Sequence, residues 1–308
     1  MAKVYFYKFN INSEIYDVYA DETLQNKILD KVFKEITTDL TVWEEYQDKD
    51  SDQNKIVEYK FCDINKDVDN RIITGRLVKI YDGEVQSYNR KEDTVDITFE
   101  EDRAASATFC FDVNREEIAF ITRVGFRYLQ FGRYFKKLLE ERFPENSFEL
   151  ILEKNVGELK SKVYGLKRIL KVNTVIVPPN ANEEEFKNLL GASVEEFKET
   201  KATKYYQGME ISSKGNRSID PKTKFFQRMF YAVGKGYANM TIEGRDKENT
   251  KVSIDSDEDT PYKATIPDNE KDSIIAFKER ANISITKLLS DKMAVTLRSD
   301  EDNEEASE

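Results

Sequence analysis

Apolar and aromatic residues recur at every second position in a series of short runs through the first 122 residues. This spacing places the apolar side chains on one face of an extended strand, whereas a helix needs a spacing of 3.6 residues. The runs are rich in β-branched and aromatic residues, so they predict strands. The expected strands cover residues 4–11, 56–64, 72–81, 95–99, 109–113 and 118–122.

The rest of the chain alternates helical and extended patterns. Asp21 is expected to cap an early helix, and Asp220 with Pro221 is expected to begin a late helix that ends before Gly234. A β-rich N-terminal portion, followed by a mixed αβ portion with a long C-terminal helix, predicts an α+β fold. The later expected helices cover residues 126–142, 183–190, 220–233 and 271–289, with strands at 148–152 and 172–177 and a hairpin within 238–254.

Charge is distributed unevenly along the chain, whose net charge is -11. Residues 1–114 hold 15 basic and 25 acidic side chains, residues 115–171 hold 13 basic and 8 acidic, and residues 198–235 hold 9 basic and 3 acidic. We therefore expect an acidic β-rich region over 1–114, an αβ region with basic helices over 115–298, and a disordered acidic tail over 299–308.

The chain contains no histidine. This excludes Ser-His-Asp and Cys-His nucleophile systems and His-ligated zinc. The glycines form no phosphate-binding loop, and Cys62 and Cys110 lie in apolar runs where reduced core cysteines are expected. We expect no catalytic residue, no metal, no cofactor and no small-molecule substrate.

Two of the expected helices, 126–142 and 220–233, carry an apolar face opposite a cationic face. A cationic face suits contacts with a phosphate backbone, and it is also typical of the solvated side of an ordinary core helix. The expected nucleic-acid-binding residues are Lys224, Arg228 and Lys235 on the later helix or just after it, Lys214 and Arg217 in the loop before it, and Arg133, Lys136 and Lys137 on the earlier helix.

Two alternative functions remain open. The acidic first region and tail suit a protein-interaction regulator or inhibitor that engages a basic partner. A metal-dependent nuclease is the third interpretation, because Glu158 with Lys160 and Glu196 with Lys198 have an acid–lysine spacing found in nuclease cores. Both pairs fall in segments that are expected to be helical, whereas such cores need a strand.

Three stretches carry a resemblance to a known family. They are residues 117–125 (EIAFITRVG), 172–180 (VNTVIVPPN) and 237–245 (YANMTIEGR), and the last precedes a hairpin, Ile266 with Pro267, and a terminal helix. This order resembles phage-exclusion proteins of the RexA type and, more loosely, the KwaB-like subunits of bacterial anti-phage systems.

The resemblance implies a cytoplasmic, non-enzymatic, homodimeric DNA-binding sensor or effector in abortive infection. It also implies a second defence protein, usually associated with the membrane. The N-terminus lacks the apolar core of a signal peptide, which agrees with a cytoplasmic protein. Binding to DNA through its backbone should be sensitive to salt. The terminal helix has an apolar face that consists of Ile274, Phe277, Ala281, Ile285 and Leu288. This face is expected either to form a dimer contact or to pack on the core of its own chain.

Overall fold

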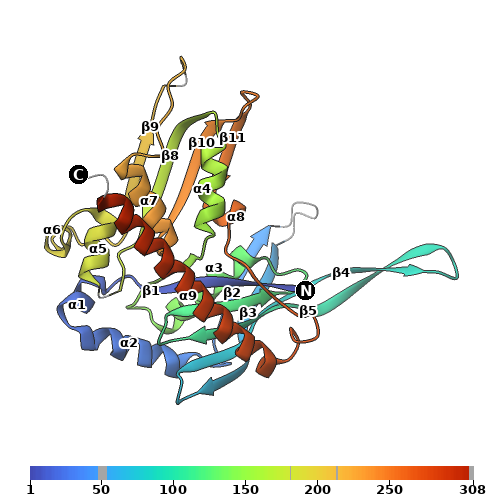
Figure 1. Ribbon diagram of the computed structural model, residues 1–308. Helices are drawn as coiled ribbons and strands as arrows, with labels where there is room; N and C mark the ends of the chain where they lie inside the picture. Colours follow the sequence, from blue (N-terminus) through green and yellow to red (C-terminus); the bar gives the residue numbers. More distant parts are fainter. Residues whose placement is uncertain (48–53, 181, 213, 305–308) are drawn as a thin grey trace.

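The computed structural model describes residues 1–47, 54–180, 182–212 and 214–304 (Figure 1). Within these residues the chain forms two antiparallel sheets, a larger sheet of eight strands and a smaller sheet of four. The fold is α+β, with a sheet-rich N-terminal half, a mixed later half and a long C-terminal helix, as the sequence predicts.

The larger sheet is organised around its N-terminal strand. In spatial order its strands are β12 (Ala264–Ile266), β1 (Ala2–Ile11), β6 (Glu117–Thr122), β5 (Thr94–Asp112), β4 (Ile72–Asn89), β3 (Asn54–Asp67) and β2 (Thr41–Gln47), and β7 (Phe148–Leu152) also pairs with β1. Along β1, Tyr5 lies opposite Phe120 of β6, whereas Phe9 lies opposite Leu150 of β7. β1 thus pairs both with β6, which belongs to the N-terminal series of hairpins, and with β7, which comes from the middle of the chain.

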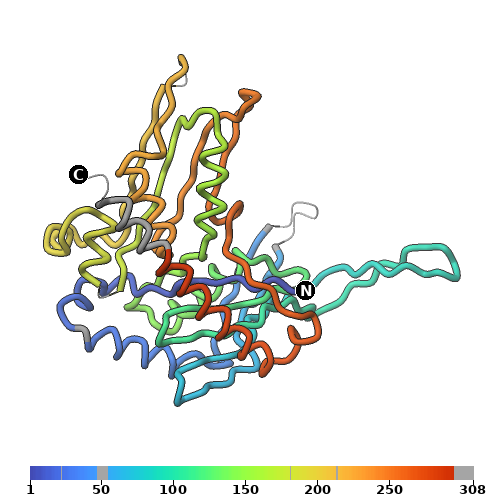
Figure 2. The backbone as a smooth tube through the Cα atoms, in the orientation of Figure 1, coloured from blue at the N-terminus to red at the C-terminus, as the bar shows by residue number. Residues whose placement is uncertain are grey.

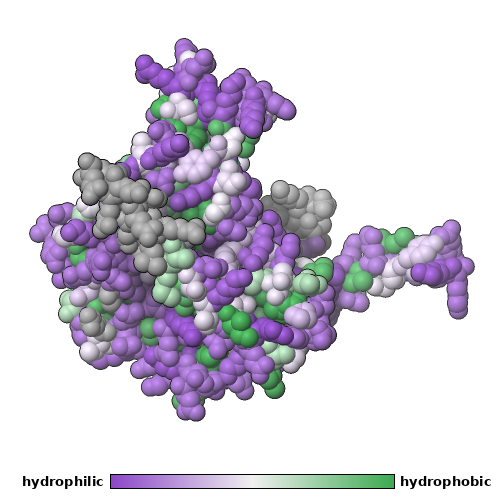
Figure 3. Space-filling view, in the orientation of Figure 1, coloured by the Kyte–Doolittle hydropathy of each residue, from purple (hydrophilic) through white to green (hydrophobic). Residues whose placement is uncertain are grey.

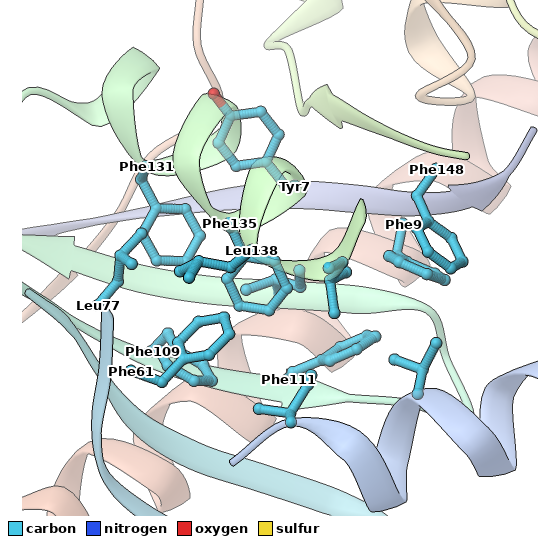
Figure 4. Close-up of a cluster of buried hydrophobic side chains, with 14 of the residues drawn as sticks. Tyr7, Phe9, Phe61, Leu77, Phe109, Phe111, Phe131, Phe135, Leu138 and Phe148 are labelled. Carbon is cyan, nitrogen blue, oxygen red and sulfur yellow. The ribbon is translucent and has the colours of Figure 1, made fainter. Parts of the chain in front are cut away.

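Helices cover the larger sheet on both faces. On one face lie α2 (Glu22–Glu35) and α3 (Tyr128–Arg142), whose aromatic side chains enter the main core (Figure 4). The rings of Phe120 and Phe131 stack with their centroids 4.0 Å apart. On the other face, α9 (Ile274–Glu304) buries Phe277, Ala281, Ile285 and Leu288 against β1, β5 and β6. The apolar face of the terminal helix therefore closes the core of its own chain.

The smaller sheet has the order β11 (Lys251–Asp255), β10 (Ala238–Arg245), β8 (Arg168–Ile176), β9 (Tyr205–Glu210). One of its faces packs against α4 (Val156–Tyr164), α5 (Glu183–Leu190) and α7 (Lys224–Gly234). The short helices are α1 (Ile15–Ala20), α6 (Val194–Lys198) and α8 (Ser256–Asp259). Figure 2 shows the smaller sheet standing away from the larger one, with its loops at the far end.

The strand pairing does not follow the expected region boundary after residue 114. That position lies in the turn between β5 and β6, where Asp112 is paired with Glu117. The larger sheet also takes β7, β12 and its α9 cover from the later region. Net charge changes near residue 114, but backbone pairing does not depend on net charge.

The end of the chain also differs from the expectation. Residues 299–304, which were expected to be disordered, continue α9, and residues 305–308 lie outside the described residues. Extending an existing helix adds one hydrogen bond per residue and needs no apolar face. The lack of apolar periodicity was therefore a poor guide to where α9 ends.

Two local expectations are corrected. The cap of α7 is Thr223 instead of Asp220, because the Thr223 hydroxyl accepts a hydrogen bond from the amide of Phe226 at 3.4 Å. Asp220 accepts from the amide of Lys222 within the preceding turn. The runs at 95–99 and 109–113 belong to one long strand, β5, and β2, β9 and β12 were not predicted.

Candidate nucleic-acid interface

The cations predicted on α3 are held by carboxylates of neighbouring strands. Glu44 of β2 accepts hydrogen bonds from Arg133, Tyr134 and Lys137, the last at 3.2 Å. Lys136 pairs with Glu149 of β7 at 2.7 Å. Partial burial acts to raise the pKa of Glu44, but the bonds from Tyr134 and Lys137 outweigh it, so that the pKa is lowered. The carboxylate stays charged and neutralises the α3 face.

The cation at the end of α7 is also paired. Lys235 lies 3.3 Å from Glu185 of α5, and both side chains are largely buried. The Lys235 ammonium also lies over the ring of Tyr231. This residue holds α5 against α7 and is not available for a phosphate.

The other four predicted residues are exposed, and within the described part of the chain they form no ion pair. Lys214 and Arg217 lie in the loop between β9 and α7, and Lys224 is the first residue of α7. Arg228 lies one turn further along α7, and its side chain crosses Gly191, where a Cβ atom would lie 2.3 Å from the guanidinium. The positive φ of 74° at Gly191 also favours glycine.

Backbone hydrogen bonds bring the loop before α7 to the far end of the smaller sheet. The amide of Ile219 donates to Ile169 at 2.9 Å, and the Arg168 guanidinium donates to the carbonyl of Arg217 at 3.0 Å. On the other side of β8, the amide of Lys167 donates to the carbonyl of Arg245 at 2.9 Å. Loops far apart in sequence therefore meet at one end of the sheet (Figure 1).

We call this region the basic end and define it as residues 165–168, 211–212, 214–224 and 245–251. It holds 9 basic and 3 acidic side chains in a protein whose net charge is -11. One basic member is offset by a neighbour outside the region, since Lys251 pairs with Glu243 at 2.7 Å. The basic side chains are Lys167, Arg168, Lys214, Arg217, Lys222, Lys224, Arg245, Lys247 and Lys251.

Four exposed members of the basic end were not predicted from the sequence: Lys167, Lys222, Lys247 and Lys251. The expected hairpin over 238–254 contains Lys247, but its position depends on the pairing of β10 with β8, which the sequence pattern does not specify. Aromatic surface lies beside these cations. Phe225 and Tyr164 are both exposed, and the Tyr164 hydroxyl accepts a hydrogen bond from Gln227 at 3.0 Å. Exposed aromatic rings beside cations are typical of surfaces that stack nucleic-acid bases.

The two acid–lysine pairs lie on helices, as expected. Glu158 and Lys160 belong to α4, and Glu196 belongs to α6. The backbone amide of Glu196 donates a hydrogen bond to the side chain of Ser193, which caps α6. Among the described residues no group of three or more Cys, Asp or Glu side chains is arranged to hold a metal ion. Neither pair therefore gathers further ligands around it in this part of the chain.

A buried ionic cluster lies where the two sheets meet. Lys8 pairs with Glu116 at 3.2 Å, and Lys292 of α9 pairs with Glu117 at 3.1 Å and with Glu153. All five side chains are at most 11% exposed. The cluster is closed to solutes, which suits a structural junction better than a substrate site.

Residues from segments that adjoin the smaller sheet, after β8 and before β10, complete this junction. Asn180 donates to Glu116 at 2.7 Å and accepts from the amide of Ile11 at 3.0 Å. Gly236, with a φ of 81°, passes so close to Glu153 that a Cβ atom would lie 2.3 Å from the carboxylate. The orientation of the basic end relative to the larger sheet is therefore fixed by buried polar contacts.

Comparison with known families gives one result. The sequence model of the family described as "Domain of unknown function (DUF4747)" matches residues 2–283. The chain belongs to this family. The DUF4747 match spans both sheets, the basic end and the start of α9, so the whole arrangement falls within one family unit. No curated protein matches the chain. No helix among the described residues is both long and apolar enough to cross a membrane.

Proposed function

We propose that this protein is a non-enzymatic DNA-binding component of a bacterial anti-phage defence system. It acts in the cytoplasm as a sensor or effector subunit and holds the DNA backbone at the basic end. The observation that carries the DNA-binding role is the convergence of Lys214, Arg217 and Lys224 with the β10–β11 hairpin. These cations are exposed, and in the described residues no carboxylate pairs with Lys214, Arg217 or Lys224.

The charge distribution determines how DNA would approach. The overall net charge of -11 repels a polyanion at long range, while the basic end attracts it within about a Debye length, roughly 8–10 Å in physiological salt. Binding is therefore modest and sensitive to salt, and it depends on contacts with phosphates more than on base sequence. Phe225 and Tyr164 add a preference for exposed bases, as in single strands or opened duplexes.

The defence role rests on the resemblance to RexA-type and KwaB-like proteins. In this proposal DNA binding at the basic end supplies recognition, and a second defence protein, associated with the membrane, carries out the response. The closed ionic cluster and the helical acid–lysine pairs are consistent with a chain that performs no chemistry on DNA.

Fluorescence anisotropy with labelled duplex and single-stranded DNA tests the DNA-binding role. The informative variant reverses Lys214, Arg217 and Lys224 to Glu. Its matched control reverses Lys3, Lys27 and Lys34 to Glu, which are exposed on the larger sheet and on α2. Each set changes the net charge by the same amount, from -11 to -17.

We expect the basic-end variant to bind at least about tenfold more weakly than the control at low salt, since each lost phosphate contact removes a charge-assisted interaction. Equal affinities of the two variants would show that only total charge matters and would contradict the role of the basic end. A parent protein that binds neither DNA form at about 50 mM salt would overturn DNA binding and favour the regulator that acts through acidic surfaces.

A further inference from the structure

The outer halves of β4 and β5 form a two-stranded ribbon that projects from the larger sheet (Figure 1). We call residues 82–103 the arm. Its strands are paired from Gly83 opposite Glu100 to Asn89 opposite Thr94. The arm is anchored at its base, where the Arg103 guanidinium donates to the carbonyl of Glu84 at 2.6 Å. An isolated two-stranded ribbon is marginally stable in water, so a surface that covers it would stabilise it.

One side of the arm is apolar. Tyr88 lies opposite Val95, and Ile97 and Phe99 follow at alternate positions, which places all four side chains on the same side. Figure 3 shows hydrophobic patches along the arm among hydrophilic residues. The only acid on this side of the paired segment is Glu84, opposite Phe99, whereas Asp96 and Glu100 lie on the other side.

A second surface, on the larger sheet near the arm, carries exposed apolar side chains beside two acids, Glu45 and Glu58. Glu58 of β3 is the partner of both Trp43 and Ile80, so these side chains share one side of the sheet. Ile56 lies two residues before Glu58 and shares that side. Helix α9 covers this side over β1 and β6, but it leaves Trp43 and Ile56 open. Alternation along β4 itself places Ile80 on the same side as Tyr88, although its pairing with β5 shifts register between Tyr81 and Gly83.

These apolar residues are unusually exposed. Trp43, Ile56, Tyr88, Val95, Ile97 and Phe99 are each between 58% and 65% exposed. Six such side chains on each of two copies would bury on the order of 1,400 Å² of apolar surface, which falls within the range of about 1,200–2,000 Å² for stable interfaces. The arm side alone would bury considerably less than a stable dimer needs.

We infer that the occupant of this surface is a second copy of this chain, and that the arm of each copy lies across Trp43 and Ile56 of the other. The arm and the open sheet face belong to the same chain. Two copies related by a two-fold axis can therefore each cover the open sheet face of the other with the same type of contact. The side of the arm that faces the partner carries one acid in its paired segment, Glu84, which limits repulsion between two acidic proteins. This assembly goes beyond the proposed function and uses no residue of the basic end.

Trp43 is the only tryptophan in the chain, so its fluorescence reports on this surface. The test measures mass by light scattering and Trp43 emission over a range of protein concentration, for the parent and two variants. The first variant changes Ile97 and Phe99 to Lys on the apolar side. The second changes Asp96 and Thr98 to Lys on the opposite side of the same strand. Far-UV circular dichroism and thermal melting confirm that each variant is folded.

We expect the parent to have twice the monomer mass of 35.9 kDa and a Trp43 emission that moves to shorter wavelength as it associates. The Ile97 and Phe99 variant should stay at 35.9 kDa with solvent-exposed emission. The Asp96 and Thr98 variant should behave like the parent. A monomeric parent at tens of micromolar, two variants with the same mass, or a dimer that leaves the Trp43 emission unchanged would overturn the inference.

Discussion

Glu117 is the side chain whose protonation links the buried junction to pH. Burial and, to a smaller extent, the charge of Glu153 raise its pKa, Lys292 and Lys8 act in the opposite direction, and the net pKa is about 7. Because this pKa lies above the ordinary glutamate value of 4.5, the folded state binds the proton more tightly than the unfolded state does. The free energy of unfolding therefore falls as pH rises from about 4.5 to about 7 and levels off above that.

The first prediction concerns Glu117→Gln, which removes this titration while keeping the shape of the side chain. The decrease in unfolding free energy that the parent shows between pH 5 and pH 7 should largely disappear. Urea unfolding at several pH values measures it. Asp67→Asn is the control, because the ammonium of Lys278 and the bonds from Asn70 lower the pKa of Asp67 to about 2. Stability from Asp67 is lost only below about pH 4, so this variant should keep the decrease. A decrease that survives in Glu117→Gln would contradict the assignment.

At the scale of elements, α9 stabilises the larger sheet through one face. Phe277 is fully buried, whereas Ile275, two residues earlier in the same helix, is 76% exposed. We predict that Phe277→Ala lowers the free energy of unfolding by about 3–5 kcal/mol, through lost apolar burial and the cavity that remains. Ile275→Ala should change it by less than about 0.5 kcal/mol. Denaturant titration of both variants checks this, and similar costs would contradict the observed orientation of α9.

The cationic face of α3 leads to a different prediction. Reversing Arg133, Lys136 and Lys137 to Glu places new negative charges beside Glu44 and Glu149. We expect a lower melting temperature, because each lost pair contributes about 0.2–1 kcal/mol and repulsion adds to that loss. DNA affinity should fall no further than in the Lys3, Lys27 and Lys34 control. A selective loss of DNA binding with an unchanged melting temperature would place α3 in the interface after all.

Helices α3 and α7 show how much of the candidate site could be predicted from the sequence. Their apolar periodicity correctly predicted core side chains such as Phe131 of α3 and Met229 of α7, but it also places Phe225 on the apolar face of α7, and that side chain is exposed. The opposite faces look equally cationic in sequence, but only the structure shows that Glu44 and Glu149 neutralise one of them. Glu44 belongs to β2, which is distant in the chain and was not predicted, whereas Glu149 belongs to β7, the predicted strand that follows α3. Periodicity constrains the buried side of a helix, whereas the partners of its exposed side depend on tertiary contacts.

On the scale of the whole molecule, acidic and basic side chains lie on separate surfaces, and this separation is stronger in the folded protein than along the sequence. The arm holds 8 acidic and 3 basic side chains, and the basic end holds 9 basic and 3 acidic. The sequence showed the alternation of acidic and basic segments, but the basic end forms only when β8 pairs with β10 and the loop before α7 returns to Ile169. The DUF4747 match covers both the arm and the basic end. The inferred assembly through the arm and the proposed DNA binding at the basic end would therefore use separate surfaces of one molecule.

The salt dependence of DNA binding tests the central claim most directly. The logarithm of the binding constant is measured against the logarithm of salt concentration for the parent, for the variant with Lys214, Arg217 and Lys224 reversed to Glu, and for the matched control. Each phosphate contact on duplex DNA contributes about 0.9 to the slope. The slope of the basic-end variant should therefore be smaller than that of the parent by about 2–3, while the control keeps the parent slope. If the basic-end variant and the control show the same slope, or if the parent binding is independent of salt, the basic end is not where this protein holds DNA.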